Sequence, residues 1–205
     1  MKIKVKNSLM LLSLAFSSLA FPSFALADQE AYRIDDSHSF ANWSIRHVAS
    51  KTSGTFSDVK GKIVIDRNDL ANSSVEAKIN VLSVNSSHAK RDEHIKKEEY
   101  LDATKFSEMT FVSSKVEAKS NTEGVLTGTL TMHGVSKQLS FPFKVLGFGS
   151  DPWGGYRMGL EAHTVLKSSD FSFGWATKPN APVGDDIEIT LLIEGVKLPP
   201  EKVIK

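Results

Sequence analysis

Arg91, Asp92 and His94 form the polar group in this sequence with the greatest potential for chemistry. If the surrounding segment is helical, Arg91 and His94 lie three residues apart and therefore share one face of the helix. Such a pair could hydrogen-bond the polar end of a ligand. Arg91 could equally form a surface ion pair with Asp92 or another carboxylate, which would contribute little free energy. The sequence leaves both interpretations open.

Signals for metal binding and catalysis are weak. The six histidines are scattered without an HExxH or HxH motif, and the lack of cysteine excludes thiolate metal sites and thiol catalysis. No G-x-S-x-G motif or related hydrolase signature occurs. We therefore expect no metal, no cofactor and no enzymatic activity. The enzyme that stays open as an alternative would use His38, Asp92 or His94 as its acid or base.

Aromatic residues are the stronger indication of function. Most should pack in a hydrophobic core, but several could instead line an elongated apolar cavity. The pattern does not distinguish a filled interior from a hollow one. With their polar and aliphatic neighbours they form the predicted ligand-binding set. Its members are Phe40, Trp43, His47, Phe56, Arg91, His94, Phe106, Phe111, Phe141, Phe143, Met158 and Leu160.

The elements that must position these residues are mostly β-strands. Apolar and polar residues alternate in eight segments, which predicts half-buried antiparallel strands. These segments are 40–48, 54–65, 75–81, 109–116, 125–132, 139–145, 156–167 and 187–194. The segment from His88 to Asp102 is rich in charge and helix formers, so we predict a short exposed helix over one end of the sheet. With so little helix, the strands must bury their apolar faces against one another, as a barrel or a sandwich.

The first 27 residues have the features of a secretory signal peptide. Three lysines precede an uncharged apolar run from Leu9 to Phe21, and Ala25-Leu26-Ala27 offers a cleavage site. The run is too short to span a bilayer, so we expect residues 28–205 to form one exported domain without stable membrane insertion. Removing three lysines takes the formal charge from +1 to −2, which does not favour nucleic acid as a partner.

Short motifs in a fixed order resemble those of the YceI-like family across essentially the whole mature chain. They include Asp36-Ser37-His38-Ser39, Ile45-Arg46-His47, Arg91-Asp92-Glu93-His94, Met109-Thr110-Phe111, the segment 128–135 and Asp151-Pro152-Trp153-Gly154-Gly155. The resemblance implies an all-β fold, an extended antiparallel eight-stranded lipocalin-like barrel with one short helix. It also implies a periplasmic location and an apolar tunnel that holds a polyisoprenoid, a quinone-like lipid or a similar amphiphile. Departures from the family pattern at Tyr100-Leu101 and Glu108-Met109 bear on the shape of that tunnel.

Three functions are compatible with these observations. The favoured one is a periplasmic binding or carrier protein for a long-chain isoprenoid lipid, which needs a dry tube with polar groups near its mouth. The others are an enzyme acting on such a lipid and a ligand-free stress-response interaction protein with a filled barrel. A homodimer could form through the turn at Trp153-Gly154-Gly155 or through an unpaired strand edge.

Overall fold

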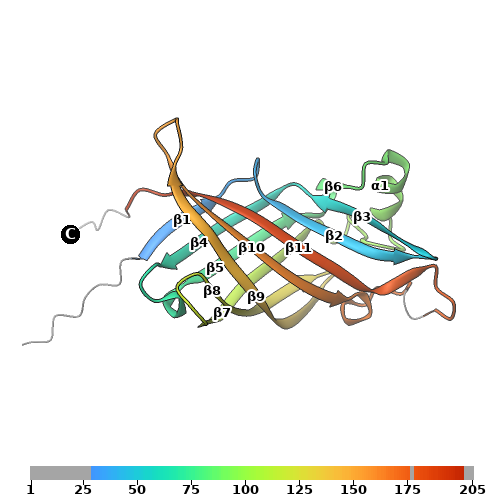
Figure 1. The fold of residues 1–205 in the computed structure, drawn as a ribbon. Helices are drawn as coiled ribbons and strands as arrows, with labels where there is room; N and C mark the ends of the chain where they lie inside the picture. The colour runs from blue at the N-terminus through green and yellow to red at the C-terminus, as the bar shows by residue number, and fades with distance from the viewer. Residues whose placement is uncertain (1–28, 176–177, 201–205) are drawn as a thin grey trace, which may run out of the picture.

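The computed structural model describes residues 29–175 and 178–200, so the expected signal peptide at 1–27 lies outside the described residues. Within them are eleven strands, one α-helix and three short 3₁₀ segments (Figure 1). The strands are β1 (Gln29–Ile34), β2 (Phe40–His47), β3 (Ser50–Phe56), β4 (Val59–Asp66), β5 (Ser74–Asn80), β6 (Val84–Asn85), β7 (Glu108–Ala118), β8 (Glu123–Met132), β9 (Val135–Ser150), β10 (Tyr156–Lys167) and β11 (Val183–Lys197). The helical elements are α1 (Ala89–Ile95), η1 (Leu70–Asn72), η2 (Val81–Ser83) and η3 (Ser168–Phe171).

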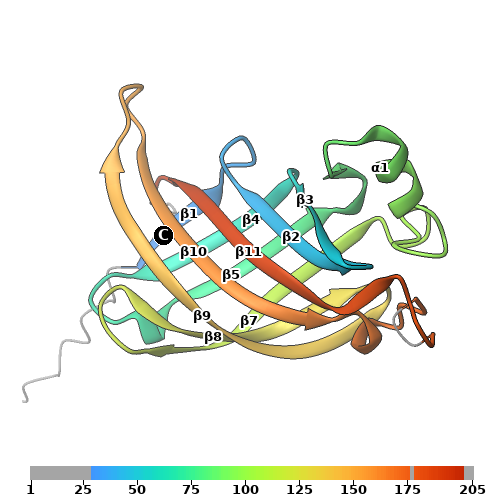
Figure 2. The same cartoon turned by 45° about the vertical axis from the view of Figure 1, so that its right-hand side comes forward.

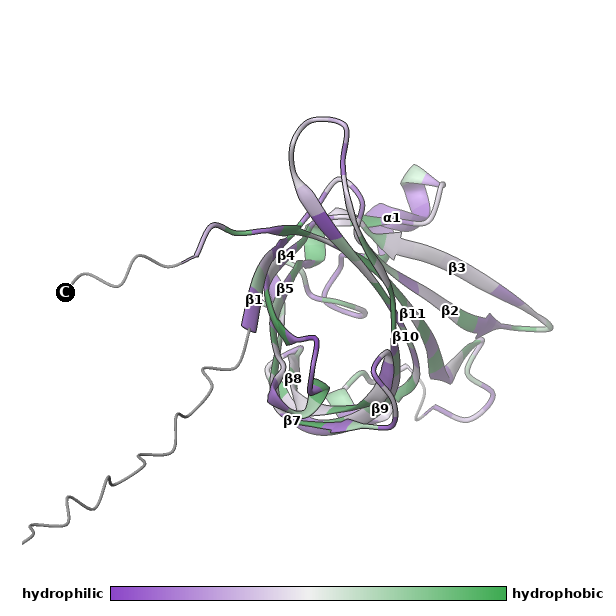
Figure 3. Ribbon diagram, turned by 60° about the vertical axis from the view of Figure 1, so that its left-hand side comes forward, coloured by the Kyte–Doolittle hydropathy of each residue, from purple (hydrophilic) through white to green (hydrophobic). Residues whose placement is uncertain are grey.

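Eight of the strands close into an antiparallel barrel. Their order is β1-β4-β5-β7-β8-β9-β10-β11, and the ring is complete because β1 pairs with β11 as well as with β4. Figure 3 shows this ring with its strands running around the interior. The predicted eight-stranded antiparallel barrel with one short helix is therefore confirmed.

The remaining three strands widen the barrel at one end. The last residues of β11 pair with β1, whereas its first part, from Val183 to Leu192, pairs with β2. β2 then pairs with β3, and β3 with the short β6. Helix α1 lies at this end, and the turn at 151–155 between β9 and β10 projects at the other (Figures 1 and 2). We call these the helix end and the hairpin end.

The predicted elements differ from the structure in several places. Residues 54–65 form two strands, because the chain turns at Ser57 and Asp58 and changes its partner from β2 to β1. Strand β1 was not predicted. The helix ends at Ile95 instead of Asp102, and the segment after it is a series of hydrogen-bonded turns such as Asp102 N to Lys97 O at 2.9 Å. No helix among the described residues has the length and hydropathy to cross a membrane.

Alternation along each strand sorts apolar residues to the inside of the barrel. On β10, Met158, Ala162 and Leu166 are buried, while Val165, between two of them, is 56% exposed. Successive side chains of a strand point to opposite faces, so one apolar row faces the interior and the other row faces solvent. The interior is thus built almost entirely from every second residue of the strands.

Candidate functional site: an apolar cavity within the barrel

The interior of the barrel is hollow. A cavity of about 470 Å³ extends from Val116 and Val145, toward the hairpin end, to His47, Arg91 and His94 at the helix end. Its lining is mainly aliphatic and aromatic. Ligand sites in proteins commonly have volumes of roughly 300–1,000 Å³ and mostly apolar walls with a few polar groups. The cavity has the size and chemistry of a site for one long apolar molecule.

Small inward-facing side chains keep the cavity open. Ala162 lines it and pairs with Phe143 of β9 and with Leu191 of β11. Ala41, Ala77 and Thr164 occupy further lining positions. A small residue beside a large one leaves a gap that a row of large residues would close, because side chains otherwise fill the interior of an eight-stranded barrel. Ala162 and Thr164 both lie in the lining, where their small side chains leave such room.

Ten of the twelve residues predicted to bind ligand line this cavity. They are Trp43, His47, Phe56, Arg91, His94, Phe111, Phe141, Phe143, Met158 and Leu160. They come from β2, β3, β7, β9, β10 and α1, segments that are far apart in the sequence. Closure of the barrel brings them together.

The structure corrects the placement of the other two, Phe40 and Phe106. Ala41, Trp43 and Ile45 face the cavity, so Phe40 belongs to the outward row of β2, where it pairs with the 39% exposed Leu192. Phe106 follows the helical segment, and its ring centroid lies 4.4 Å from that of His133. It packs against the turn between β8 and β9 and is not part of the cavity lining.

An aromatic contact at the helix end was not predicted from the sequence. The ring centroid of Tyr100 lies 4.9 Å from that of His94 and 5.4 Å from that of Trp175. Trp175 in turn stacks on Phe173, with 4.5 Å between the ring centroids. All four side chains line the cavity. They join the segment after α1 to the segment after η3 and narrow this end of the barrel. Neither segment shows the alternation typical of a strand. The only signal for this contact in the sequence is the aromatic pair Phe173 and Trp175 on either side of Gly174.

Arg91 and Asp92 both bind Ser86. Arg91 donates from Nε to Ser86 Oγ at 2.7 Å and from Nη2 to Ser86 O at 2.5 Å. The Ser86 N–H and hydroxyl donate to Asp92 Oδ1, at 2.8 and 2.5 Å. Burial raises the pKa of Asp92, but the Ser86 hydrogen bonds and nearby positive charge lower it overall. Ser86 thereby holds Arg91 at the cavity. In the described part of the chain Arg91 forms no direct ion pair, but its charge is one of those that lower the pKa of the neighbouring Asp92.

Trp43 depends on the absence of a side chain at Gly54. An ideal Cβ at Gly54 would lie 2.5 Å from Trp43 Cζ2 and 2.6 Å from the Asn85 carbonyl oxygen, closer than the 3.0 Å below which Cβ contacts essentially do not occur. The Trp43 Nε1 atom is buried without a hydrogen-bond partner among the described residues. Glycine at this position therefore lets the indole lie flat against β3.

We expect Gly54→Ala to lower the free energy of unfolding by about 1–3 kcal/mol, the usual cost of overpacking a well-packed site. The added methyl must displace the indole or β6, so the near-ultraviolet circular dichroism of tryptophan should change as well. Urea denaturation measures the first effect. Gly149→Ala is the control, because a Cβ there meets nothing within 4 Å. Equal stability of the two variants would contradict this packing.

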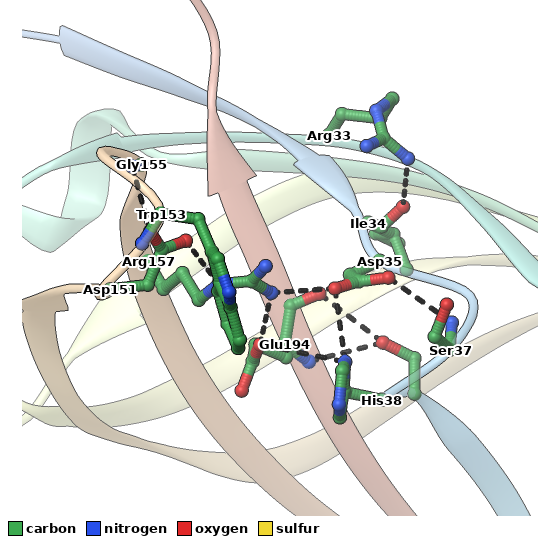
Figure 4. Close-up of polar contacts among 11 residues, drawn as sticks. Arg33, Ile34, Asp35, Ser37, His38, Asp151, Trp153, Gly155, Arg157 and Glu194 are labelled. Carbon is green, nitrogen blue, oxygen red and sulfur yellow. Dashed lines mark hydrogen bonds and ion pairs between the residues drawn. The ribbon is translucent and has the colours of Figure 1, made fainter.

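His38 lies in a separate cluster around Arg157 (Figure 4). Arg157 Nη1 donates to Asp35 Oδ2 at 2.6 Å and also to Glu194 Oε1, and its Nε donates to Asp151 Oδ2 at 2.8 Å. His38 Nδ1 lies 3.1 Å from Asp35 Oδ2. The hydrogen bonds from Arg157 hold the pKa of Asp35 and that of Asp151 below their usual range. The cluster joins the β1–β2 corner, the hairpin end and β11.

Among the described residues, this cluster also contains side chains that lie close enough together to hold a metal ion. Asp35, His38 and Glu194 each place one possible ligand atom within 4.8 Å of the others. Arg157 already supplies a cation to both carboxylates, so we interpret the group as a salt-bridge cluster. Of the candidate acid and base residues, His94 lines the cavity, Asp92 accepts hydrogen bonds from Ser86, and His38 belongs to the Arg157 cluster.

An eight-stranded antiparallel barrel around an apolar cavity places this protein among the lipocalin-like barrels. Residues 32–195 match the family model described as the YceI-like domain, and the chain belongs to that family. Protein YceI of Salmonella agona (strain SL483) is 37% identical over 190 residues, which cover 91% of this chain and 97% of that protein.

Two solved structures show the likeness of the fold. BcnA of Burkholderia cenocepacia superposes with a TM-score of 0.70 at 20% identity, covering 78% of this chain and 98% of BcnA. A polyisoprenoid binding domain from Saccharophagus degradans superposes with a TM-score of 0.62 at 15% identity, covering 82% of this chain and 98% of that domain. At these identities the comparison concerns the fold alone.

Proposed function

We propose that this protein binds a long-chain isoprenoid lipid, or a similar amphiphile, with its tail inside the barrel. The observation that carries the proposal is the apolar cavity, which extends through the barrel and has polar side chains only at a few positions. A polyprenyl tail has no hydrogen-bonding groups, so an apolar wall satisfies it. Arg91, His94 and His47 at the helix end offer polar groups to a head group, and His94 Nε2 already contacts Glu99 Oε1 at 2.7 Å.

Burial of the tail supplies enough free energy for such a complex. Each methylene removed from water contributes about 0.8 kcal/mol, so three isoprene units give on the order of 10 kcal/mol before the costs of binding. Ordering the flexible chain and losing its translational freedom offset much of this gain. Because the cavity is preformed, the protein itself loses little conformational freedom when the lipid binds. We therefore expect micromolar or tighter binding, with loose selection of tail length.

The chemical class of the ligand is supported by the comparisons. The Saccharophagus degradans domain with the same fold is described as polyisoprenoid binding. An isoprenoid tail also suits a tube lined by aliphatic and aromatic side chains, because it is long, narrow and uniformly apolar. A quinone-like lipid meets the same requirements and differs only in its head group.

We further propose that the protein acts in the periplasm as a carrier, not as an enzyme. The first 27 residues support export, since they combine a basic start, an apolar run and a small-residue cleavage site. A binding role is supported by the lining of the cavity, which includes His94 but neither of the other two candidate acid and base residues, His38 and Asp92. The alternative of a ligand-free interaction protein with a filled barrel is disfavoured by the hollow interior.

Organic extraction of the purified protein tests this function. Protein isolated from bacterial cells should release a prenyl lipid that mass spectrometry detects in roughly stoichiometric amount. A mock purification from cells without the protein is the control. Extracts that match the mock purification under several growth conditions, together with failure to bind added geranylgeraniol, would overturn the proposal.

A further inference from the structure

The cavity stops before the barrel does at the hairpin end, where β1, β9, β10 and β11 come together (Figure 1). Along β1 its lining stops at Ile34, and along β9 it stops at Val145. Alternation places Tyr32 and Phe148 at the next inward positions of these strands, and neither belongs to the described lining. Tyr32 is 0% exposed. The protein's own side chains therefore close the tube at this level.

The two strands between β1 and β9 stop contributing to the lining at the same level. On β10 the last lining residue is Met158, and the next inward residue, Tyr156, lies outside the lining. On β11 the last lining residue is Ile193, and the next inward residue is Gly195. A Cβ at Gly195 would lie 2.9 Å from Tyr32 Cβ and 3.1 Å from Met158 Cγ. Glycine at this position therefore makes room for Tyr32 inside the barrel.

Tyr32 and Phe148 contact each other across the interior. Their ring centroids lie 6.2 Å apart, although β10 and β11 separate β1 from β9 in the ring of strands. Arg67, an exposed residue just after β4, places its guanidinium carbon 4.2 Å from the centroid of the Phe148 ring. A cation over an aromatic face is an attractive contact. We call Tyr32, Phe148 and Arg67 the hairpin-end plug.

Hydrogen bonds hold Tyr32 in this position. Its hydroxyl donates to Glu30 Oε2 at 2.6 Å, and Lys197 Nζ donates to Glu30 Oε1 at 2.5 Å. Burial and the hydrogen bond to Glu30 raise the pKa of Tyr32, so the phenol keeps its proton and stays a donor at neutral pH. Moving the ring aside would break a hydrogen bond of a buried group, which is unfavourable. The plug is therefore a firm end to the tube.

We propose that Tyr32 sets the longest lipid tail that the barrel accommodates, with Phe148 and Arg67 completing the stop. This inference rests on the proposed function and adds a limit on tail length. Each isoprene unit that enters the cavity adds apolar burial and hence affinity. Units beyond the limit stay outside, at the helix end, and add little. Affinity should therefore rise with tail length and then level off.

A series of prenyl alcohols from farnesol to solanesol, each one isoprene unit longer than the last, tests this limit. Competition against deuterated geranylgeraniol on the delipidated protein, followed by native mass spectrometry, ranks their affinities. Each added unit should tighten binding about tenfold up to the limit and by less than about twofold beyond it.

Tyr32→Ala should move the limit by at least one isoprene unit. The phenol ring that is lost is at least as large as one such unit. The first alcohol beyond the original limit should therefore bind about tenfold more tightly to the variant than to the unaltered protein. Alcohols shorter than the limit do not reach the plug, so their affinities should change by no more than about twofold.

Two variants serve as controls. Tyr32→Phe keeps the ring and loses only the hydrogen bond to Glu30, so the limit should stay where it is in the unaltered protein. Phe171→Ala removes a ring that is 1% exposed and lies outside the described lining. It should lower the free energy of unfolding without moving the limit, which separates a general loss of packing from the opening of the tube.

Phe148→Ala removes the other ring of the plug and should also move the limit, so it decides the matter if Tyr32→Ala does not fold. An unmoved limit in the alanine variant that folds overturns the inference and leaves tail binding intact. Affinity that keeps rising through solanesol in the unaltered protein overturns it as well. If none of the alcohols binds the unaltered protein, the proposed function itself fails, and the inference fails with it.

Discussion

Ala162→Trp should reduce the affinity for a prenyl lipid by about 100-fold while the protein stays folded. The indole would project from β10 into the middle of the cavity, where the tail is proposed to lie. Displacing one isoprene unit removes about 4 kcal/mol of favourable apolar burial, which corresponds to nearly three orders of magnitude in affinity. The net loss is smaller, because the displaced part of the chain no longer has to be ordered on binding. Because the indole enters empty space, it should not cause the usual cost of overpacking.

Val165→Trp is the matched control for this variant. Val165 lies three residues away on the same strand but points outward and is 56% exposed. Titration with geranylgeraniol should show unaltered affinity for the control, and thermal unfolding should show both variants to be folded. An Ala162→Trp protein that binds as tightly as the unaltered chain would contradict an internal site. One that fails to fold would indicate a filled barrel.

Arg157→Met should cause the largest loss of stability among single ion-pair deletions in this protein. The substitution removes the partner of three carboxylates at once, and two of them, Asp35 and Asp151, have side chains only 11% and 8% exposed. Carboxylates left without a cation in a partly desolvated site are strongly unfavourable. Lys167→Met, which breaks an exposed pair with Asp186, is the control and should have little effect.

The loss of stability caused by Arg157→Met should depend on pH in a defined direction. The pKa of Asp35 is lowered in the folded protein by Arg157, so its contribution to stability is complete above the unfolded-state pKa of about 4. This contribution disappears as the pH falls below about 4 toward the folded-state pKa. Urea midpoints of the two proteins should differ by a constant amount from pH 5 to 8 and converge at lower pH. A difference that grows on acidification would contradict the assignment.

Much of the fold follows from the alternation of apolar and polar residues. The strands around 75–81, 156–167 and 187–194 were predicted within a few residues, because each has a clear inward row. The turn between β3 and β4 was missed because Ser57 and Asp58 interrupt the pattern only briefly. β1 carries no such long alternation, and its place is fixed by pairing with β4 and β11, which are distant in sequence.

The candidate site was harder to predict than the strands. Aromatic identity indicated an apolar interior, yet it could not show whether that interior was filled or hollow, which depends on the summed volumes of residues from different strands. A shift of one residue along β2 separates Phe40, outside, from Ala41, inside. The role of Ser86 in holding Arg91 also depends on three-dimensional proximity that no local motif encodes.

Nuclear Overhauser effects between bound geranylgeraniol and the methyl groups of the protein test the central claim most directly. The lipid should contact Leu160, Ile189 and Leu191, which line the cavity. It should show no contact with Val112, Val165 or Leu192, which are 51%, 56% and 39% exposed. Contacts confined to this outward set would place the lipid on the surface of the barrel and contradict the account.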